Sequence, residues 1–213
     1  MDWTVDPIKF LTRDHQERLV RYCEERAIVD LAKGRSRWVR RWAMVDTLLY
    51  TGLRLSELVN LHVGDCHLNG RGMLLVRRGK GGKRRTVILE RTLTHHLAQY
   101  LQWKLNAGEA VAPNDSLFTL STGKPYSSRA VQCAFKLACK AAGLPAHYSV
   151  HSARHTYATN LYNLTKDLRL VQKQLGHSSP SVTAVYADVF PEVVGETLDR
   201  LRPQSAATGR SLH

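Results

Sequence analysis

Hydrophobic residues recur with a helical period over the first third of the chain. They form an apolar face over 12–33, where Thr12 is a plausible N-cap, so we predict a helix there. Apolar side chains from Trp38 to Leu49 follow at spacings of three and four and predict a second helix. A short third helix is expected over 56–61, starting at a serine cap. The chain therefore opens with helices.

The pattern changes in the middle of the chain. Two short, β-prone runs, 73–76 and 86–89, flank the glycine-rich stretch 77–85. From Arg71 to Arg85 there are seven basic residues and no acidic one. We therefore predict a β-hairpin with a strongly basic tip.

The helical period then returns for the rest of the chain. Helices are expected over 92–105, 127–142, 149–164, 167–175, 182–186 and 192–201. The prediction is a mainly α fold with a small antiparallel β-sheet, of the α+β class. We expect one domain over 1–202 and a flexible tail over 203–213, which is rich in Ser, Ala and Gly.

Charge narrows the range of partners. The 213 residues include 31 Lys and Arg against 18 Asp and Glu, a formal net charge of +13, which favours a polyanionic partner such as nucleic acid or an anionic membrane surface. No apolar run reaches the roughly 20 residues of a membrane span. The basic residues gather on a hairpin, whereas a membrane-surface helix would carry them opposite large apolar side chains, so nucleic acid is favoured.

The cysteines and the first residues bear on the compartment. Cys23, Cys66, Cys133 and Cys139 form neither a CxxC pair nor a zinc-like cluster with histidine. We expect buried or half-buried free thiols in a reducing cytoplasm, and no metal. The first ten residues lack the basic and apolar regions of a secretory signal, which also favours the cytoplasm.

Six side chains together suggest chemistry on a phosphodiester, although each has a plainer explanation alone. They are Arg54, Lys80, His151, Arg154, His177 and Tyr186.

Arg54 follows a glycine at a helix end, where its planar fork could grip a phosphate, or it could simply pair with Glu57. His151 and Arg154 lie three residues apart and share a helix face, so they could bind a phosphodiester and move a proton. They could equally be a polar pair at the rim of that helix. His155 points elsewhere and is expected to support the others.

The other three residues leave similar choices open. His177 follows a glycine at a helix end, where it could donate to a phosphate oxygen or interact with the helix terminus. Lys80 could donate a proton to a leaving oxygen, but the bare sequence hardly separates it from Lys83. Tyr186 could be a nucleophile or a packed aromatic.

The motifs that hold these residues resemble those of the tyrosine recombinases, the phage-integrase and Xer-type family. The resemblance runs from about Leu11 to Leu201 and rests on four stretches: TGLRLSEL, GKGGKRRTVIL, HSARHTYAT and LGHSSPSVTAVYADV. The motifs place the family's two catalytic arginines on Arg54 and Arg154, its lysine on Lys80 and its two histidines on His151 and His177. The nucleophile falls on Tyr186, and Glu57 matches a supporting acidic position.

The resemblance implies a tyrosine recombinase catalytic-domain fold and a site-specific DNA recombinase or integrase. Tyr186 would attack a DNA phosphodiester, forming a 3′-phosphotyrosyl intermediate, and a 5′-hydroxyl would later reseal the strand. No cofactor, metal or ATP is expected, because the covalent link conserves the bond's free energy. Arginines and lysines of the hairpin are expected to contact DNA: Arg77, Arg78, Lys83, Arg84 and Arg85.

The resemblance also implies partners. These are double-stranded DNA at a specific recombination site, a homotetramer that exchanges a C-terminal segment such as 192–201, and an accessory DNA-bending protein. The expected location is the cytoplasm, associated with the nucleoid. No separate N-terminal core-binding domain is evident, so we expect a naturally short recombinase or a fragment.

Two rival functions stay open. A type IB topoisomerase-like relaxase would share the chemistry without a defined site or a tetramer. A DNA-binding accessory factor that no longer cuts would bind the site without a covalent product.

Overall fold

The computed structural model describes residues 10–77 and 84–176. The three strands follow one another in the middle of the chain, with helices before and after them. The elements are, in order, α1 (Arg13–Ala32), α2 (Arg37–Thr51), α3 (Leu55–Val59), the 3₁₀ turn η2 (Val63–Asp65), β1 (Cys66–His67), β2 (Met73–Val76), β3 (Arg85–Ile88), α4 (Arg91–Asn106), α5 (Ser128–Ala141), α6 (Val150–Thr165) and α7 (Leu168–Leu175). This is the expected helix-rich fold with a small antiparallel sheet. The helices predicted at 182–186 and 192–201 and the tail lie outside the described residues.

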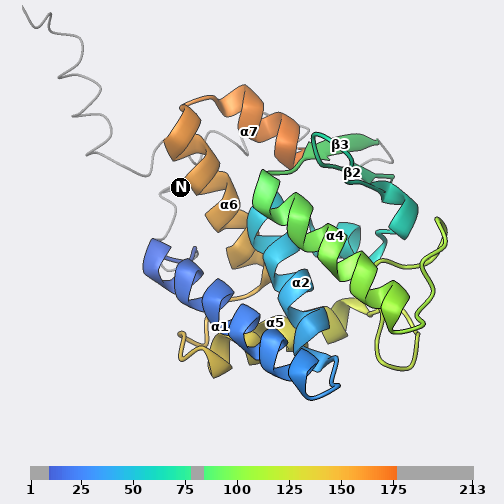
Figure 1. The fold of residues 1–213 in the computed structure, drawn as a ribbon. Coiled ribbons are helices and arrows are strands. Elements are labelled where there is room, and N and C mark those ends of the chain that lie inside the picture. Colours follow the sequence, from blue (N-terminus) through green and yellow to red (C-terminus); the bar gives the residue numbers. More distant parts are fainter. Residues whose placement is uncertain (1–9, 78–83, 177–213) are drawn as a thin grey trace, which may run out of the picture.

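Helix α2 is the centre of the fold. It packs against α1, α4, α5 and α6, and most of its residues are buried. Figure 1 shows it running between these helices, with its last turn near α7 and the sheet. Because apolar side chains cover more than one face of α2, the helix is enclosed by the others and its two ends are fixed in place.

The sheet has three antiparallel strands in the order β1–β2–β3. Met73 pairs with Ile88 and Val76 pairs with Arg85, which confirms the predicted hairpin. Its tip, 78–83, lies outside the described residues. Strand β1 was not predicted, because two residues are too few to show an alternating pattern. Figure 1 shows α7 beside β3.

Side-chain caps fix most of the predicted helix starts. The side chains of Thr12, Ser127, Ser149 and Asp167 accept backbone N–H bonds at the starts of α1, α5, α6 and α7. The short helix α3 is present, but its predicted serine cap was wrong, because Ser56 lies inside the helix and Arg54 occupies the cap position. The Glu57 carboxylate accepts the Arg54 backbone N–H at 2.7 Å and so moves the helix start forward.

The four cysteines are free. Cys23 and Cys139 are buried and Cys66 is half-buried, as expected, and burial raises the pKa of Cys23 and Cys139 to about 12. The expectation of a buried or half-buried thiol was wrong for Cys133, which lies on the exposed face of α5. The amphipathic pattern of α5 turns this position toward solvent.

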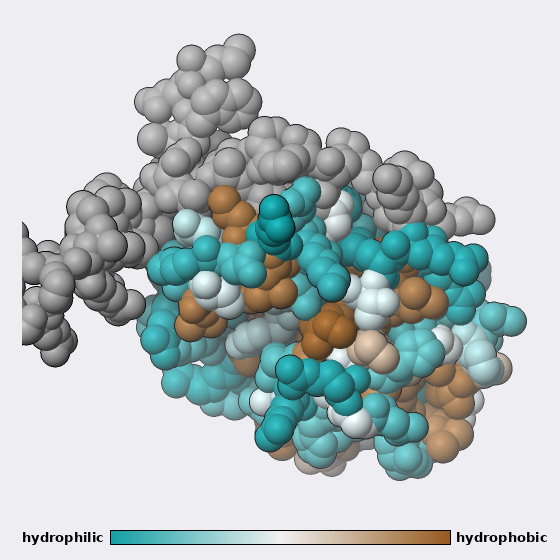
Figure 2. Space-filling model, turned by 90° about the horizontal axis from the view of Figure 1, so that it is seen from above, coloured by the Kyte–Doolittle hydropathy of each residue, from teal (hydrophilic) through white to brown (hydrophobic). Residues whose placement is uncertain are grey.

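One face of the molecule is mostly polar. Figure 2 shows hydrophilic side chains there with small hydrophobic patches among them. Within the described ranges, no helix combines the length and the apolar character required to cross a bilayer.

Candidate functional site

The junction between α2 and α3 is the framework of the candidate site. Gly52 ends α2 in the left-handed conformation, with φ 60°, and its N–H donates to the Leu48 carbonyl at 3.3 Å. A Cβ at Gly52 would lie 2.6 Å from Tyr157 and 2.7 Å from Leu175. Only glycine therefore lets α6 and α7 approach the end of α2 this closely.

Glu57 joins two arginines from different elements. Arg54 Nη1 donates to Glu57 Oε1 at 2.9 Å, and Arg85 of β3 donates to both Glu57 oxygens, at 2.5 and 2.9 Å. The Glu57 side chain is 1% exposed, that of Arg85 12% and that of Arg54 27%. Both guanidiniums are thus held on a buried carboxylate, and Arg54 keeps the greater access to solvent.

This environment sets the charge of Glu57. Burial by itself would raise the pKa of the carboxyl. The hydrogen bonds from the Arg85 side chain and the Arg54 backbone, with the charges of both arginines, outweigh burial and hold the pKa below its usual range. Glu57 therefore stays ionised at neutral pH.

Arg154 lies in α6 and joins the ends of two other helices. Its Nη1 donates to the Gly52 carbonyl at the end of α2, and its Nη2 donates to the Leu175 carbonyl at the end of α7, at 2.9 Å. Arg154 is only 9% exposed. Reciprocal bonds between Ser149 and Ser152 fix the start of α6. The position of Arg154, in the next turn of the helix, is thereby fixed relative to both carbonyls.

The end of α7 completes the cluster. Gly176 ends the helix in the left-handed conformation, with φ 65°, and its carbonyl accepts from Arg54 Nη2 at 3.3 Å. Arg85 Nε donates to the Gln174 carbonyl at 3.1 Å. A Cβ at Gly176 would lie 2.6 Å from Arg85 Cδ, so the arginine packs directly on the backbone turn. Arg54, Arg85 and Arg154 all converge on the last residues of α7.

The structure places the other predicted residues less closely or not at all. His151 is exposed in the first turn of α6, three residues from buried Arg154. Arg77 is exposed and its Nε lies 2.5 Å from Asp65 Oδ1, while Arg84 is exposed beside β3. The remaining predicted residues lie outside the described ranges: Arg78, Lys80, Lys83, His177 and Tyr186.

Sequence reasoning missed the role of Arg85 inside the protein and assigned it only to DNA contact. A signal was present, because Arg85 and the buried Val87 lie two residues apart in β3 and so share one face of the strand. Whether Arg85 also touches DNA stays a prediction.

The cluster can attract and hold an anion. The guanidiniums of Arg54 and Arg85 bind the buried carboxylate of Glu57, and that of Arg154 binds the Leu175 carbonyl at the end of α7. Guanidinium forks match the oxygens of a phosphodiester and stabilise charge that builds up on them. Across residues 10–77 and 84–176, no group of three or more His, Cys, Asp or Glu side chains is placed to hold a metal.

Comparison with known proteins identifies the family. The phage integrase family matches residues 9–192. The chain is 35% identical over 169 residues to tyrosine recombinase XerC of Proteus mirabilis, covering 78% of this chain and 53% of the relative. It is 37% identical over 163 residues to XerC of Lactobacillus leichmannii, covering 76% and 55%. The chain thus spans about half the length of these relatives.

Solved structures agree with the sequence relatives. The XerA recombinase matches with a TM-score of 0.73 and 29% identity, covering 92% of this chain and 66% of that one. The XerH site-specific recombinase bound to a palindromic difH substrate matches with a TM-score of 0.72 and 25% identity, covering 89% and 52%. With the fold, the arginine cluster and the family match in agreement, the chain belongs to the phage integrase family of tyrosine recombinases.

Proposed function

We propose that the chain is the catalytic part of a site-specific recombinase that cuts and rejoins DNA through a covalent bond to Tyr186. The single observation that carries the proposal is the arginine cluster at the end of α7. Arg54 binds the Gly176 carbonyl and Arg154 binds the Leu175 carbonyl, so both guanidiniums are fixed next to the point where the chain continues to His177 and Tyr186.

The chemistry follows from these side chains. The Tyr186 oxygen attacks the phosphorus, the bond from phosphorus to the 5′-oxygen breaks, and a 3′-phosphotyrosyl link forms. His151 accepts the phenol proton, and Lys80 donates a proton to the leaving 5′-oxygen. Arg54, Arg154 and His177 stabilise the charge on the non-bridging oxygens. Attack by a 5′-hydroxyl from the partner strand reverses these steps and releases Tyr186.

The proposal includes the partners of the reaction. The substrate is double-stranded DNA at a specific site, in keeping with the DNA complex of the related XerH structure. Exchange of strands between two duplexes requires four active protomers, and we propose that segment 192–201 passes between neighbours. We also propose an accessory DNA-bending protein as a partner. The protein would act in the cytoplasm, at the nucleoid.

Covalent capture tests this function. DNA attached to the wild-type protein is recovered from cells and sequenced, and a nicked duplex of the recovered sequence then serves as substrate. Tyr186→Phe should abolish the covalent adduct and retain binding in a mobility-shift assay, because only the nucleophilic oxygen is lost. Tyr162→Phe, on α6, is the matched control and should form the adduct. An adduct formed by Tyr186→Phe at the wild-type level would refute the assignment.

A further inference from the structure

Two adjoining hollows surround the loop between α1 and α2, at the opposite end of α2 from the arginine cluster. Their volumes are about 720 and 630 Å³. We call them together the junction hollow, and both are lined by Gly34, Arg35, Ser36, Arg40 and Ser121. Arg40 precedes Gly52 by twelve residues along α2, which places them roughly 18 Å apart.

The lining carries a surplus of positive charge. Arg26, Arg35, Arg37, Arg40 and Lys104 line the junction hollow, against two carboxylates, those of Asp30 and Glu109. The five cations and two anions leave three positive charges uncompensated within this lining. A hollow of this kind raises the local concentration of anions.

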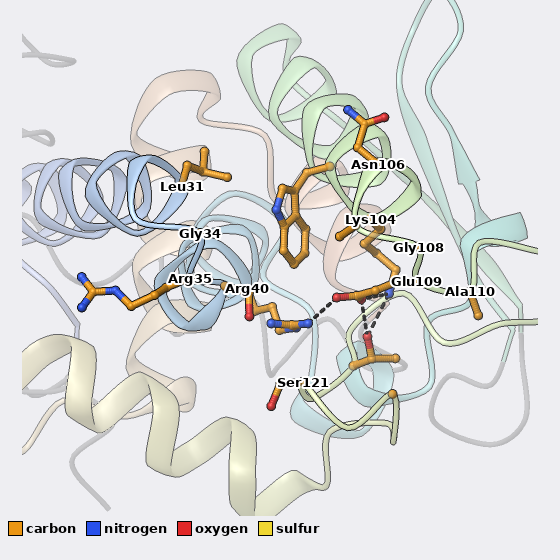
Figure 3. Close-up of a pocket in the computed structure, with 15 residues that line it drawn as sticks. Leu31, Gly34, Arg35, Arg40, Lys104, Asn106, Gly108, Glu109, Ala110 and Ser121 are labelled. Atoms are coloured by element: carbon orange, nitrogen blue, oxygen red, sulfur yellow. Dashed lines mark hydrogen bonds and ion pairs between the residues drawn. The ribbon is translucent and has the colours of Figure 1, made fainter.

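Two of the cations are buried and share one carboxylate. Arg40 is 5% exposed and Lys104 is fully buried. Arg40 binds Glu109 Oε1, while Lys104 Nζ lies 3.1 Å from Glu109 Oε2 and 2.8 Å from Thr119 Oγ1. Figure 3 shows Arg40 turned toward Glu109 and Arg35 pointing away from it. A buried charge is costly unless it is paired, so this trio would gain from a second anion.

Two of the lining arginines also carry unused hydrogen-bond donors. The buried Nε atoms of Arg26 and Arg40 have no partner among the described residues. The junction hollow also meets the start of α2, where the Ser36 side chain makes no capping bond and the Trp38 N–H donates to the Asp30 carboxylate at 2.9 Å. Trp38 supports the arginines, with the Arg26 guanidinium 5.8 Å from its ring centre.

We propose that the junction hollow binds a phosphate group. Guanidinium forks match the several oxygens of a phosphate, while the two carboxylates already present hold Arg35, Arg40 and Lys104 in place. The phosphate comes either from a DNA backbone remote from the cleavage point or from a free phosphate species. The DNA source rests on the proposed function, whereas binding of free phosphate does not.

The first arm of the test uses inorganic phosphate. Phosphate should raise the melting temperature of the wild-type protein by about 2–4 °C over chloride at equal ionic strength. The double variant Arg26→Gln, Arg37→Gln removes two lining cations that have no described ion pair and should lose this response. The matched control Arg21→Gln, Lys136→Gln removes two exposed charges that do not line the junction hollow, and should keep it.

The second arm uses a DNA duplex without a recombination site. Each lost phosphate contact should reduce the magnitude of the slope of log affinity against log salt by about 0.9. The slope of the Arg26→Gln, Arg37→Gln variant should therefore be smaller in magnitude than that of the control variant by about 1–2. A variant that loses the response to phosphate but keeps the salt slope would support the site and identify a free phosphate species as its ligand.

Different results would refute the phosphate site and the proposed function. Equal melting responses and equal salt slopes in the two double variants would overturn the phosphate site. Absence of a covalent adduct with the wild-type protein would instead refute the recombinase proposal, and it would leave the inorganic phosphate arm fully interpretable.

Discussion

Glu57→Gln is the sharpest test of the arginine cluster. The change keeps the shape of the side chain but removes the negative charge, and it places an amide N–H₂ against one of two guanidiniums. Loss of one partner in a buried ion pair costs about 3–5 kcal/mol. The Arg54 side chain is 27% exposed and can recover some hydration, so we expect a loss of about 2–3 kcal/mol in the free energy of unfolding.

The effect has a defined dependence on pH. The folded protein holds the pKa of Glu57 below its usual range, so the carboxylate stabilises the fold above the unfolded pKa of about 4.3. This stabilisation is lost as the pH falls through the lower folded pKa. The gap between wild type and Glu57→Gln should therefore be full at pH 7 and narrow below about pH 4.

Urea unfolding at several pH values measures this gap. Glu24→Gln, which removes an exposed carboxylate from α1, is the control and should change the unfolding free energy by less than about 0.5 kcal/mol. Displacement of Arg54 should also slow adduct formation on the nicked duplex about 10–100-fold. A gap at pH 7 as small as that of the control, or one that stays constant down to pH 3, would show that Glu57 does not hold the arginines.

Three further changes test the packing around the site and the core. Gly176→Ala should cost about 1–3 kcal/mol more than Gly108→Ala in chemical denaturation, because both need positive φ but only the first crowds an arginine; equal losses would contradict this. A carboxylate hydrogen bond raises the pKa of His96, so its stabilisation is present below about pH 6.5 and declines as the pH rises through the folded pKa. His96→Gln should abolish that decline in the free energy of unfolding between pH 6 and pH 8. An unchanged decline would show that a group other than His96 causes it. Glu109→Gln should lower the free energy of unfolding more than Lys104→Met does in the same assay, because it leaves buried Arg40 and Lys104 without their shared carboxylate. A larger loss with Lys104→Met would show that the two cations do not share Glu109.

Local patterns were enough to predict most of the elements. The Thr12 cap and the end of a helix at Gly176 each depend on a few neighbouring residues, and the structure has them where the sequence indicated. The start of α3 was misplaced because a carboxylate from inside the helix bonds back to Arg54. Such a bond competes with an ordinary serine cap, and the sequence does not show which of the two wins.

The candidate site could be predicted only as a set of residues. The motifs singled out Arg54 and Arg154, and the sequence offered Glu57 as a partner of Arg54, but nothing in it showed what holds Arg154. Arg154 is bound by carbonyl oxygens that are 102 and 21 residues away in the chain. Any residue type supplies a carbonyl, so no sequence pattern reveals these contacts. The pairing of Arg85 with Glu57 across 28 residues likewise depends on how the sheet meets α3.

The way Arg154 is held has a consequence for its charge. Its two carbonyl partners close α2 and α7, where aligned peptide dipoles give each helix about half a negative charge. Two such partial charges, from different helices, stabilise the buried guanidinium. The cost of burying Arg154 is therefore reduced. The backbone of two helices, which substitutions of side chains leave intact, supplies this electrostatic support.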